Sequence, residues 1–389
     1  MSYTVSHPTP TQATAAVRGA LTVTHHTDWA AVASLAPAWQ QLARAQRDPT
    51  VFAGFGFTRA LWKSFGQDAR LELLSVADGN ELVGLIPFAP RTVRRAGVKF
   101  AETGFFRNHH TIRNAVLIRP GAERAVLAAL FAAVAGMRNW DVMFLENVPD
   151  DPGMLSPLDE VLAEQGLRRD AIEPGRRLCF LPVQGSWDEY RATKSGNFRQ
   201  QLKKFRRRAA EHGRVEFRCL STRDEIAAAL PDVFALRAKS WQGRARAEAA
   251  EVAADQAFDY ALLEELDDVE IGDLWLMTID GGLVASLRML GDARKRYVHT
   301  MHYDPALKDV APGMLLFEEM LAAAWAARLA EVDFHGNSAF FRRWSTQNRE
   351  HVTTRIYFPS AFGLLLRIGR RVRQRWSRRG AEAADGDAD

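Results

Sequence analysis

Hydrophobic residues recur at helical and strand spacings along most of the chain. In segment 27–45 they recur every three or four positions, which predicts one amphipathic helix, and segment 56–65 predicts a second. Residues 71–90 contain two apolar runs around Asp78-Gly79-Asn80, a combination that favours two strands joined by a turn. The pattern then predicts strands at 98–104, 114–118, 140–147 and 178–183, with helices at 120–137 and 155–165.

The second half of the chain repeats this order of elements. Ser186 with Glu189, and Thr222 with Glu225, have the spacing of a capping box, which satisfies free backbone N–H groups at a helix start. The predicted elements are a helix from 186, a basic helix after 194, helices at 222–241, 255–267 and 314–329, a hairpin at 273–290 that turns at 280–282, and strands at 294–303 and 331–337.

A weak internal repeat links the two halves. Residues 141–147 and 331–337 share the pattern acid-Val-x-Phe-x-x-Asn. Chance similarity between two short strands is the alternative explanation. We expect two copies of one unit, hence the α/β (α+β) class with two tandem lobes, each a mixed, mostly antiparallel sheet flanked by helices.

Composition narrows the class of protein. Hydrophobic residues make up 47% and charged residues 25%, the usual balance of a soluble globular chain. No apolar run approaches the roughly 18 residues that a membrane-spanning helix needs, and no secretory signal is visible. The two cysteines, Cys179 and Cys219, exclude a disulfide framework and a thiolate metal cluster. These features predict a cytoplasmic protein.

The net charge of +4 hides two strongly cationic segments, 194–208 and 367–379. The first has no acidic residue between 190 and 210, so it is either a solvated helix face or a surface for an anionic acceptor. The second is a basic amphipathic pattern that would pack on the second lobe or attach peripherally to an anionic membrane at its inner face. No nucleic-acid motif accompanies either segment, so nucleic acid is not expected as a partner.

The segment from Tyr303 to Leu329 has the form of a phosphate-binding turn. A strand ends, a loop containing Lys308, Pro312 and Gly313 follows, and a long helix begins. The free N–H groups of a helix start suit a phosphate or pyrophosphate. An ordinary helix N-terminus is the alternative.

The order hairpin, strand, phosphate-type loop, helix, strand resembles the GNAT acyltransferase core. Four motifs make residues 186–344 similar to bacterial acetyltransferases of the CelD/BcsL group, two-lobed relatives of Fem-type peptidoglycan aminoacyltransferases. They are SGNFRQQLKKFRRRAAEHG from residue 195, LRAKSW from 236, YDPALKDVAPGMLLFEEML from 303 and EVDFHGNSAFFRRW from 331. With a looser match in the first half, the resemblance covers most of residues 50–350.

The resemblance implies transfer of an acetyl or acyl group from acyl-CoA, with no metal, to a hydroxyl or amine. The implied acceptor is a saccharide or a cell-envelope or exopolysaccharide precursor, such as a nucleotide- or lipid-linked sugar. Acyl-CoA would contact Thr300, Met301, Tyr303, Lys308, Val310, Ala311, Pro312, Gly313 and Met314. The usual GNAT loop reads Gln/Arg-x-x-Gly-x-Gly/Ala, and only the cation Lys308 and the last glycine survive here.

The candidate catalytic residues are His302, Asp333, His335 and Arg342, and the candidate substrate-binding residues are Lys194, Arg199, Lys203, Arg237 and Trp241. A histidine beside a carboxylate can act as a base. In Fem-type enzymes an aromatic–lysine pair follows the last core strand, and Phe341-Arg342 stands there in this chain. Arginine stabilises negative charge but cannot act as a base.

Two alternatives to acyl-CoA chemistry remain at this point, a Fem-like transferase that uses aminoacyl-tRNA and a non-enzymatic module that binds polyanions or a membrane surface. The expected organisation is a flexible segment at 1–20, lobes at 21–183 and 184–358, a basic amphipathic helix at 359–379 and an acidic disordered tail at 380–389.

Overall fold

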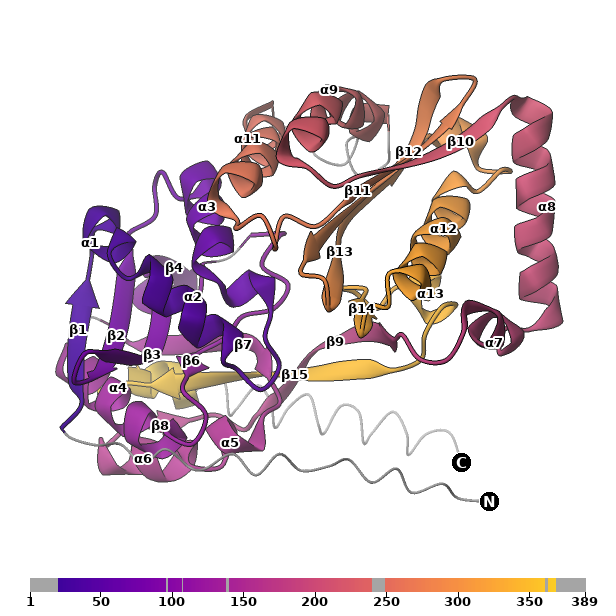
Figure 1. The fold of residues 1–389 in the computed structure, drawn as a ribbon. Helices are drawn as coiled ribbons and strands as arrows, with labels where there is room; N and C mark the ends of the chain where they lie inside the picture. The colour runs from indigo at the N-terminus through magenta and orange to yellow at the C-terminus, as the bar shows by residue number, and fades with distance from the viewer. Residues whose placement is uncertain are drawn as a thin grey trace, which may run out of the picture.

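The computed structural model describes residues 20–95, 97–106, 108–137, 140–239, 249–360 and 363–368. It consists of two α/β lobes that lie side by side (Figure 1). The predicted fold class, two lobes of mixed sheet flanked by helices, is confirmed.

The first lobe is built from the elements before residue 170. Its strands are β1 (Thr22–His26), β2 (Glu72–Asp78), β3 (Glu81–Phe88), β4 (Arg91–Arg95), β5 (Val98–Gly104), β6 (Leu117–Ile118), β7 (Val142–Pro149) and β8 (Arg168–Arg169). Its helices are α1 (Trp29–Ala33), α2 (Ala36–Arg44), the 3₁₀ turn η1 (Val51–Ala53), α3 (Phe55–Phe65), α4 (Glu123–Met137), α5 (Pro152–Leu155) and α6 (Leu158–Glu164).

The second lobe has the long helices. They are α7 (Trp187–Ala192), α8 (Gly196–His212), α9 (Arg223–Lys239), α11 (Ala249–Glu265), the 3₁₀ turn η2 (Pro305–Leu307), α12 (Pro312–Ala326) and α13 (Ala339–Arg342). The strands are β10 (Val215–Leu220), β11 (Leu274–Ile279), β12 (Gly282–Gly291), β13 (Lys295–Tyr303) and β14 (Glu331–Asp333). Both predicted capping boxes are present, because each side chain binds the other residue's backbone N–H.

Both lobes contain a strand, a long helix and a second strand that lies parallel to the first. In the second lobe, β13 and β14 pair in parallel on either side of α12 in sequence. In the first lobe, β5 and β7 pair in parallel on either side of α4. This shared unit is what the sequence repeat at residues 141–147 and 331–337 predicts.

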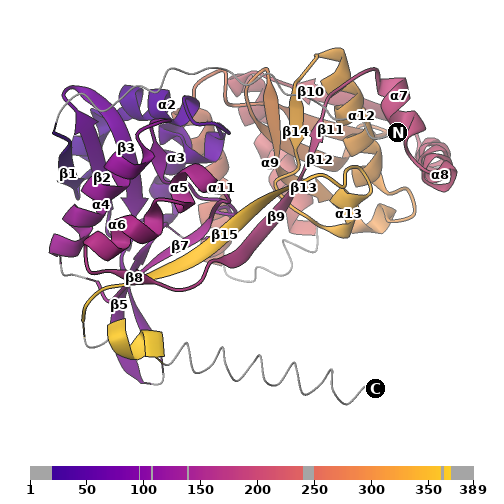
Figure 2. The same ribbon diagram turned by 90° about the horizontal axis from the view of Figure 1, so that it is seen from below.

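Two long strands join the lobes into one sheet. β9 (Glu173–Pro182) pairs with β14, and β15 (Asn348–Tyr357) pairs with both β9 and β7. The eleven-stranded sheet therefore runs through both lobes, and Figure 2 shows β9 and β15 side by side across the junction. The predicted boundary after residue 183 falls just beyond β9, and the predicted end of the second lobe at 358 falls just beyond β15.

One hydrophobic cluster belongs to both lobes. Phe52 and Phe57 of the first lobe pack with Phe258 of α11 and Tyr297 of β13. Helix α3 lies along α11, so apolar side chains fill the contact between the lobes. The elements that carry the site are thus held together by buried apolar surface.

Several sequence predictions are wrong in detail. Segment 27–45 is not one helix, since α1 ends at Ala33 and α2 begins at Ala36. Pro37 lies in the first turn of α2, where proline is tolerated, but it would break a helix that continued from α1. The strand predicted at 114–118 is only the two-residue β6, which pairs with β3, whereas β5 pairs with β4 and β7. Strands β1, β4, β8, β10 and β15 were not predicted.

The strand predicted at 331–337 ends at Asp333. His335 has φ 51°, in the left-handed region, so the backbone turns there and leaves the sheet. The side chains of Asp333 and His335 therefore do not lie on one face of a regular strand.

Some predictions lie mostly outside the described residues: the flexible segment 1–20, Trp241, the basic helix 359–379 and the tail 380–389. Within the part of the chain that is described, no helix has the length and apolar character to cross a bilayer.

Candidate active site between the lobes

An opening separates β13 from β14 beyond their first three residues. The strands pair only where Lys295–Tyr297 lies beside Glu331–Asp333. β13 continues to Tyr303 with no described strand on this edge, while the chain after Asp333 turns away. Backbone N–H and C=O groups of β13 are thus available to an extended ligand.

The start of α12 lies against the far end of β13. Ala311, the N-cap, has φ 52°, and Pro312 and Gly313 form the first turn. A Cβ placed on Gly313 would lie 3.5 Å from Tyr303 Cδ1 and 3.7 Å from Met301 Sδ. The predicted cofactor residues on the strand and in the loop are therefore neighbours. Lys308 is exposed at the rim, and Val310 is buried beneath the loop.

The basic helix α8 lies beside this loop. The Arg208 Nη1 donates a hydrogen bond of 3.1 Å to the Asp309 carbonyl, and His212 Nε2 lies 3.8 Å from the Asp309 carboxylate. Arg208 and His212 of α8 are therefore close to the loop that leads into α12. This arrangement favours a phosphorylated ligand.

A β-bulge interrupts β13 at His299. Arg288 of β12 lies opposite Thr300, and Met289 lies opposite Val298, so His299 has no partner residue of its own. Its ring packs against Phe57, Phe258 and His110. Neither ring nitrogen has a hydrogen-bond partner among the described residues. Burial, followed by the charges of its neighbours, lowers the His299 pKa well below its usual value, so the imidazole is neutral at pH 7.

His335, a predicted catalytic residue, lies on the opposite side of the opening. Its ring stacks on Phe52 with centroids 3.9 Å apart, and neither ring nitrogen is hydrogen-bonded within the described structure. Burial lowers its pKa well below the usual value, and the positive charge of Arg113 acts in the same direction. His335 is therefore also a neutral imidazole.

Asp333 is engaged by other groups. Its carboxylate accepts hydrogen bonds from Arg113 Nη2 at 2.7 Å, from Arg349 Nη1 at 3.2 Å and from the His335 backbone N–H at 2.8 Å. Asp333 is completely buried, so it fixes two arginines and the turn at His335. Both His335 ring nitrogens lack a hydrogen-bond partner in the described structure, so Asp333 and His335 do not form a histidine–carboxylate pair through their side chains.

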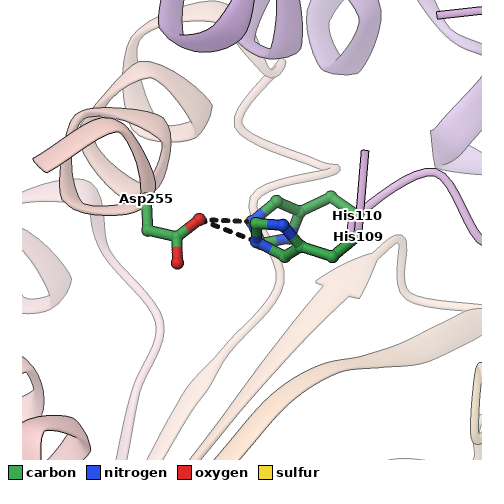
Figure 3. Close-up of side chains that lie close together, drawn as sticks. All are labelled: His109, His110 and Asp255. Carbon is green, nitrogen blue, oxygen red and sulfur yellow. Dashed lines mark hydrogen bonds and ion pairs between the residues drawn. The ribbon is translucent and has the colours of Figure 1, made fainter. Parts of the chain in front are cut away.

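A second histidine–aspartate cluster lies next to the bulge. His109 Nε2 and His110 Nε2 lie 2.7 Å and 3.2 Å from the same oxygen of Asp255, as Figure 3 shows. The histidines come from the first lobe and Asp255 from α11, so the cluster spans the contact. The His110 ring centroid is 5.3 Å from that of His299.

This cluster has the donor atoms of a metal site, because its ligand atoms lie within 4.8 Å of one another. Arg237 contacts the other oxygen of Asp255, and Asp259 lies 3.8 Å from the same arginine. A divalent cation would thus share its carboxylate with a buried guanidinium. Charge compensation within the cluster fits these residues better than a metal does.

The predicted substrate-binding residues do not form one site. Arg237 is buried in the histidine cluster, whereas Arg199 and Lys203 are exposed on α8. Figures 1 and 2 place α8 at the edge of the second lobe that lies away from the first lobe. The motif spacing could not reveal this, because it does not say which side of the sheet each helix covers.

Lys194 and Arg342 do meet, at the start of α8. Both line a cavity of about 520 Å³ together with Arg343. Lys194 donates to the Trp344 carbonyl, and Arg342 Nη1 donates to the Asn337 carbonyl at 2.6 Å. Burial lowers the Lys194 pKa.

His302, a predicted catalytic residue, is buried on β13. Strand alternation points its side chain away from the α12 side that Met301 and Tyr303 face.

A larger cavity of about 650 Å³ lies in the first lobe and was not predicted. Its lining includes Asp48, Arg113, Asn114, Arg349 and His351. Arg113 connects it to the opening, because the same side chain binds Asp333 and lies over the rings of Phe52 and Tyr297. No sequence signal marked Arg113, since an isolated arginine in a loop has no distinguishing pattern.

Buried histidines predict loss of stability in acid. Burial, with a contribution from Arg113, lowers the His351 pKa to about 4. Because this pKa is below that of the unfolded chain, its stabilising contribution is complete above pH 6.5 and is lost as pH falls toward 4. The unfolding free energy of the parent should fall between pH 7 and pH 4.5, and in His351→Gln this fall should be smaller by about 2–3 kcal/mol.

Urea unfolding of both proteins at several pH values measures this difference. Asp259, whose pKa is raised to about 6 by burial, acts in the opposite direction but is present in both proteins and cancels. Parallel pH curves for parent and variant would contradict the assignment to His351.

Comparison with known proteins agrees with this geometry. Residues 196–343 match the profile of the acetyltransferase (GNAT) domain family. No curated protein shows significant sequence similarity. The fold is similar to that of FemX, with TM-score 0.57 and 12% identity over 83% of this chain and 95% of that one.

Two further solved structures share the fold. One is a conserved protein of unknown function from Bacteroides thetaiotaomicron, with TM-score 0.52 and 14% identity over 82% of this chain and 96% of that one. The other is the C-terminal DUF2156 domain of a candidate lysylphosphatidylglycerol synthetase from Agrobacterium fabrum, with TM-score 0.50 and 12% identity over 86% and 94%. Residues 196–343 are thus similar to the acetyltransferase (GNAT) domain family, within a two-lobed chain whose fold resembles that of FemX.

Proposed function

We propose that this protein transfers an acetyl or longer acyl group from acyl-CoA to a hydroxyl or amine. The observation that carries the proposal is the free edge of β13 beyond its pairing with β14, which ends at the first turn of α12 within the residues that match the GNAT domain family. An extended thioester could follow this free strand edge and place its phosphorylated end at the start of α12.

The predicted cofactor residues take distinct roles in this proposal. The free edge of β13, with Met301 and Tyr303, would hold the pantetheine arm, and the turn from Val310 to Met314 would hold the pyrophosphate. Arg208 and the neighbouring cations of α8 would neutralise the phosphates, which assigns the basic helix to the cofactor and not to the acceptor.

We expect acetyl-CoA to raise the melting temperature of the protein and Gly313→Glu to abolish this rise. A ligand at a hundredfold excess over its Kd stabilises by about 2.7 kcal/mol, which corresponds to a shift of a few degrees. The glutamate would extend toward Met301 and Tyr303 and place a negative charge where the phosphates bind. Thermal-shift assays with several CoA thioesters measure this.

The matched control is Gly136→Glu, because Gly136 lies in α4 and a Cβ placed on it would have no atom of another residue within 4 Å. This variant should keep the full shift with acetyl-CoA. If no thioester stabilises the parent, or if Gly313→Glu responds as the parent does, acyl-CoA is not bound between the free edge of β13 and the start of α12.

For the acceptor, we propose a saccharide or a cell-envelope precursor, as in the CelD/BcsL acetyltransferases that the sequence resembles. The cavity of about 650 Å³ supports a polar acceptor, because charged side chains of both signs line it and it reaches Arg113 beside the opening. Peripheral membrane contact is a prediction for segment 359–379, most of which lies outside the described residues.

A Fem-like transfer from aminoacyl-tRNA is the second candidate, and the similarity to the FemX fold favours it. Phe341-Arg342 weakens it, because arginine replaces the lysine of the Fem-type pair. Label transferred from charged tRNA, and none from acyl-CoA, would establish this reaction in place of the first.

A further inference from the structure

We propose that acyl transfer takes place on the side of the β13–β14 opening that faces the first lobe, and that the bulged residue His299 is the general base. This inference rests on the proposed acyl-CoA activity and assigns a catalytic residue that the sequence motifs did not single out.

The bulge reverses which face of the sheet β13 presents. Tyr297 faces the first lobe, since its hydroxyl donates to the Pro49 carbonyl at 2.7 Å. Met301 and Tyr303 face α12, where they approach Gly313. In a regular strand these three residues would share one face, because side chains alternate with period two. The extra residue at His299 shifts this alternation by one position, so that Tyr297 faces one side of the sheet and Met301 and Tyr303 face the other.

A ligand that follows β13 therefore crosses the sheet at the bulge. Its phosphates would lie at α12 on one face, and its thioester would emerge through the opening on the other face. His299 stands at the crossing, because its ring contacts Phe57 of the first lobe and Phe258 of α11. Bulges beside active sites commonly serve to aim a side chain.

The state of the His299 ring fits the role of a base. Both ring nitrogens are shielded from solvent without a hydrogen-bond partner in the described structure. An unsatisfied buried polar group of this kind costs free energy, and an incoming hydroxyl or amine would satisfy it. Desolvation keeps the imidazole neutral, and a neutral ring can accept a proton.

The chemical step balances with these groups. The acceptor oxygen or nitrogen attacks the thioester carbonyl while its proton passes to a ring nitrogen of His299. Collapse of the tetrahedral intermediate breaks the C–S bond, and the thiolate of CoA takes the proton back from the imidazolium. The products are the acylated acceptor and CoA with a free thiol, and His299 returns to its neutral form.

The position of His299 can be tested without knowing the acceptor. Bromoacetyl-CoA carries an electrophilic carbon at the place of the acyl group, and a neutral imidazole beside it displaces bromide to form a stable N-alkyl adduct. We expect mass spectrometry of the digested full-length protein to find the adduct on His299, and excess acetyl-CoA to suppress it. An adduct on His335 or on Cys179 in place of His299, with the same protection, would overturn the assignment.

Turnover provides the second measurement. His299→Gln should lower the release of CoA thiol from acetyl-CoA, with water or an added amino sugar as acceptor, by at least about 100-fold. The control His26→Gln, in β1 of the distal sheet, should release thiol at the parent rate. Loss of less than threefold in His299→Gln would overturn the role as base.

A thermal shift with acetyl-CoA separates the two ideas. If His299→Gln is stabilised as the parent is but does not turn over, the residue acts in chemistry and the fold is intact. If the parent itself shows no shift, the proposed acyl-CoA function is wrong and the inference falls with it. Partial recovery of thiol release in His299→Gly by added imidazole would further support the base, since a structural defect is not repaired in this way.

Discussion

Replacing Asp333 with alanine should lower the free energy of unfolding by about 3–5 kcal/mol, because it leaves buried positive charge without its counter-ion. Asp333 is fully buried and binds Arg113 and Arg349 on one carboxylate. Arg113 is only 5% exposed, lies over the rings of Phe52 and Tyr297, and forms an ion pair with Asp333. A typical domain is stable by only about 5–15 kcal/mol, so the loss is a large part of the total.

Urea unfolding at neutral pH measures this loss. The control is Asp159→Ala, which removes an exposed carboxylate from its pair with Arg169 and should cost no more than about 1 kcal/mol. Equal effects of the two substitutions would show that Asp333 does not compensate buried charge. Asp333→Asn should fall between them, since an amide can still accept the His335 N–H but carries no charge.

Truncating Phe258 to alanine should cost about 3–5 kcal/mol, because the cavity opens in the apolar cluster shared by both lobes. The Phe258 ring is fully buried and packs on Phe57 and Phe65 of α3, with centroids 5.6 Å away in both cases. The substitution therefore removes contacts between lobes as well as within α11.

The same helix offers the control, Tyr260→Ala, whose side chain is 41% exposed and does not belong to this cluster. It should change the unfolding free energy by less than about 1 kcal/mol. A small effect of Phe258→Ala, comparable to that of the control, would indicate that the lobes are held by something other than this apolar contact.

Local patterns in the sequence identified the elements but not how they meet. Both capping boxes, the hairpins and α12 follow from residues that are neighbours along the chain. The path of β9 and β15 could not be predicted, because antiparallel pairing between distant strands leaves no periodic signal in either one. The break between α1 and α2 was missed because the apolar spacing continues across it.

The candidate site shows the same division. The turn before α12 was predicted, since Lys308, Pro312 and Gly313 mark a loop before a helix. His299 was not singled out, because a bulge depends on the register with β12 and not on the residue type. The predicted substrate-binding residues lie on two sides of the second lobe, which the sequence also could not show. Sequence order does not determine which face of the sheet a helix covers.

The shared strand β15 has a consequence for synthesis on the ribosome. The first lobe buries Val352, Ile356 and Phe358 in its own hydrophobic cluster, although these residues follow the second lobe in the sequence. A nascent chain generally folds domain by domain as it emerges. Here the edges of β7 and β9 that pair with β15 stay open until residue 358 leaves the exit tunnel, so the first lobe is completed only after the whole second lobe has been synthesised.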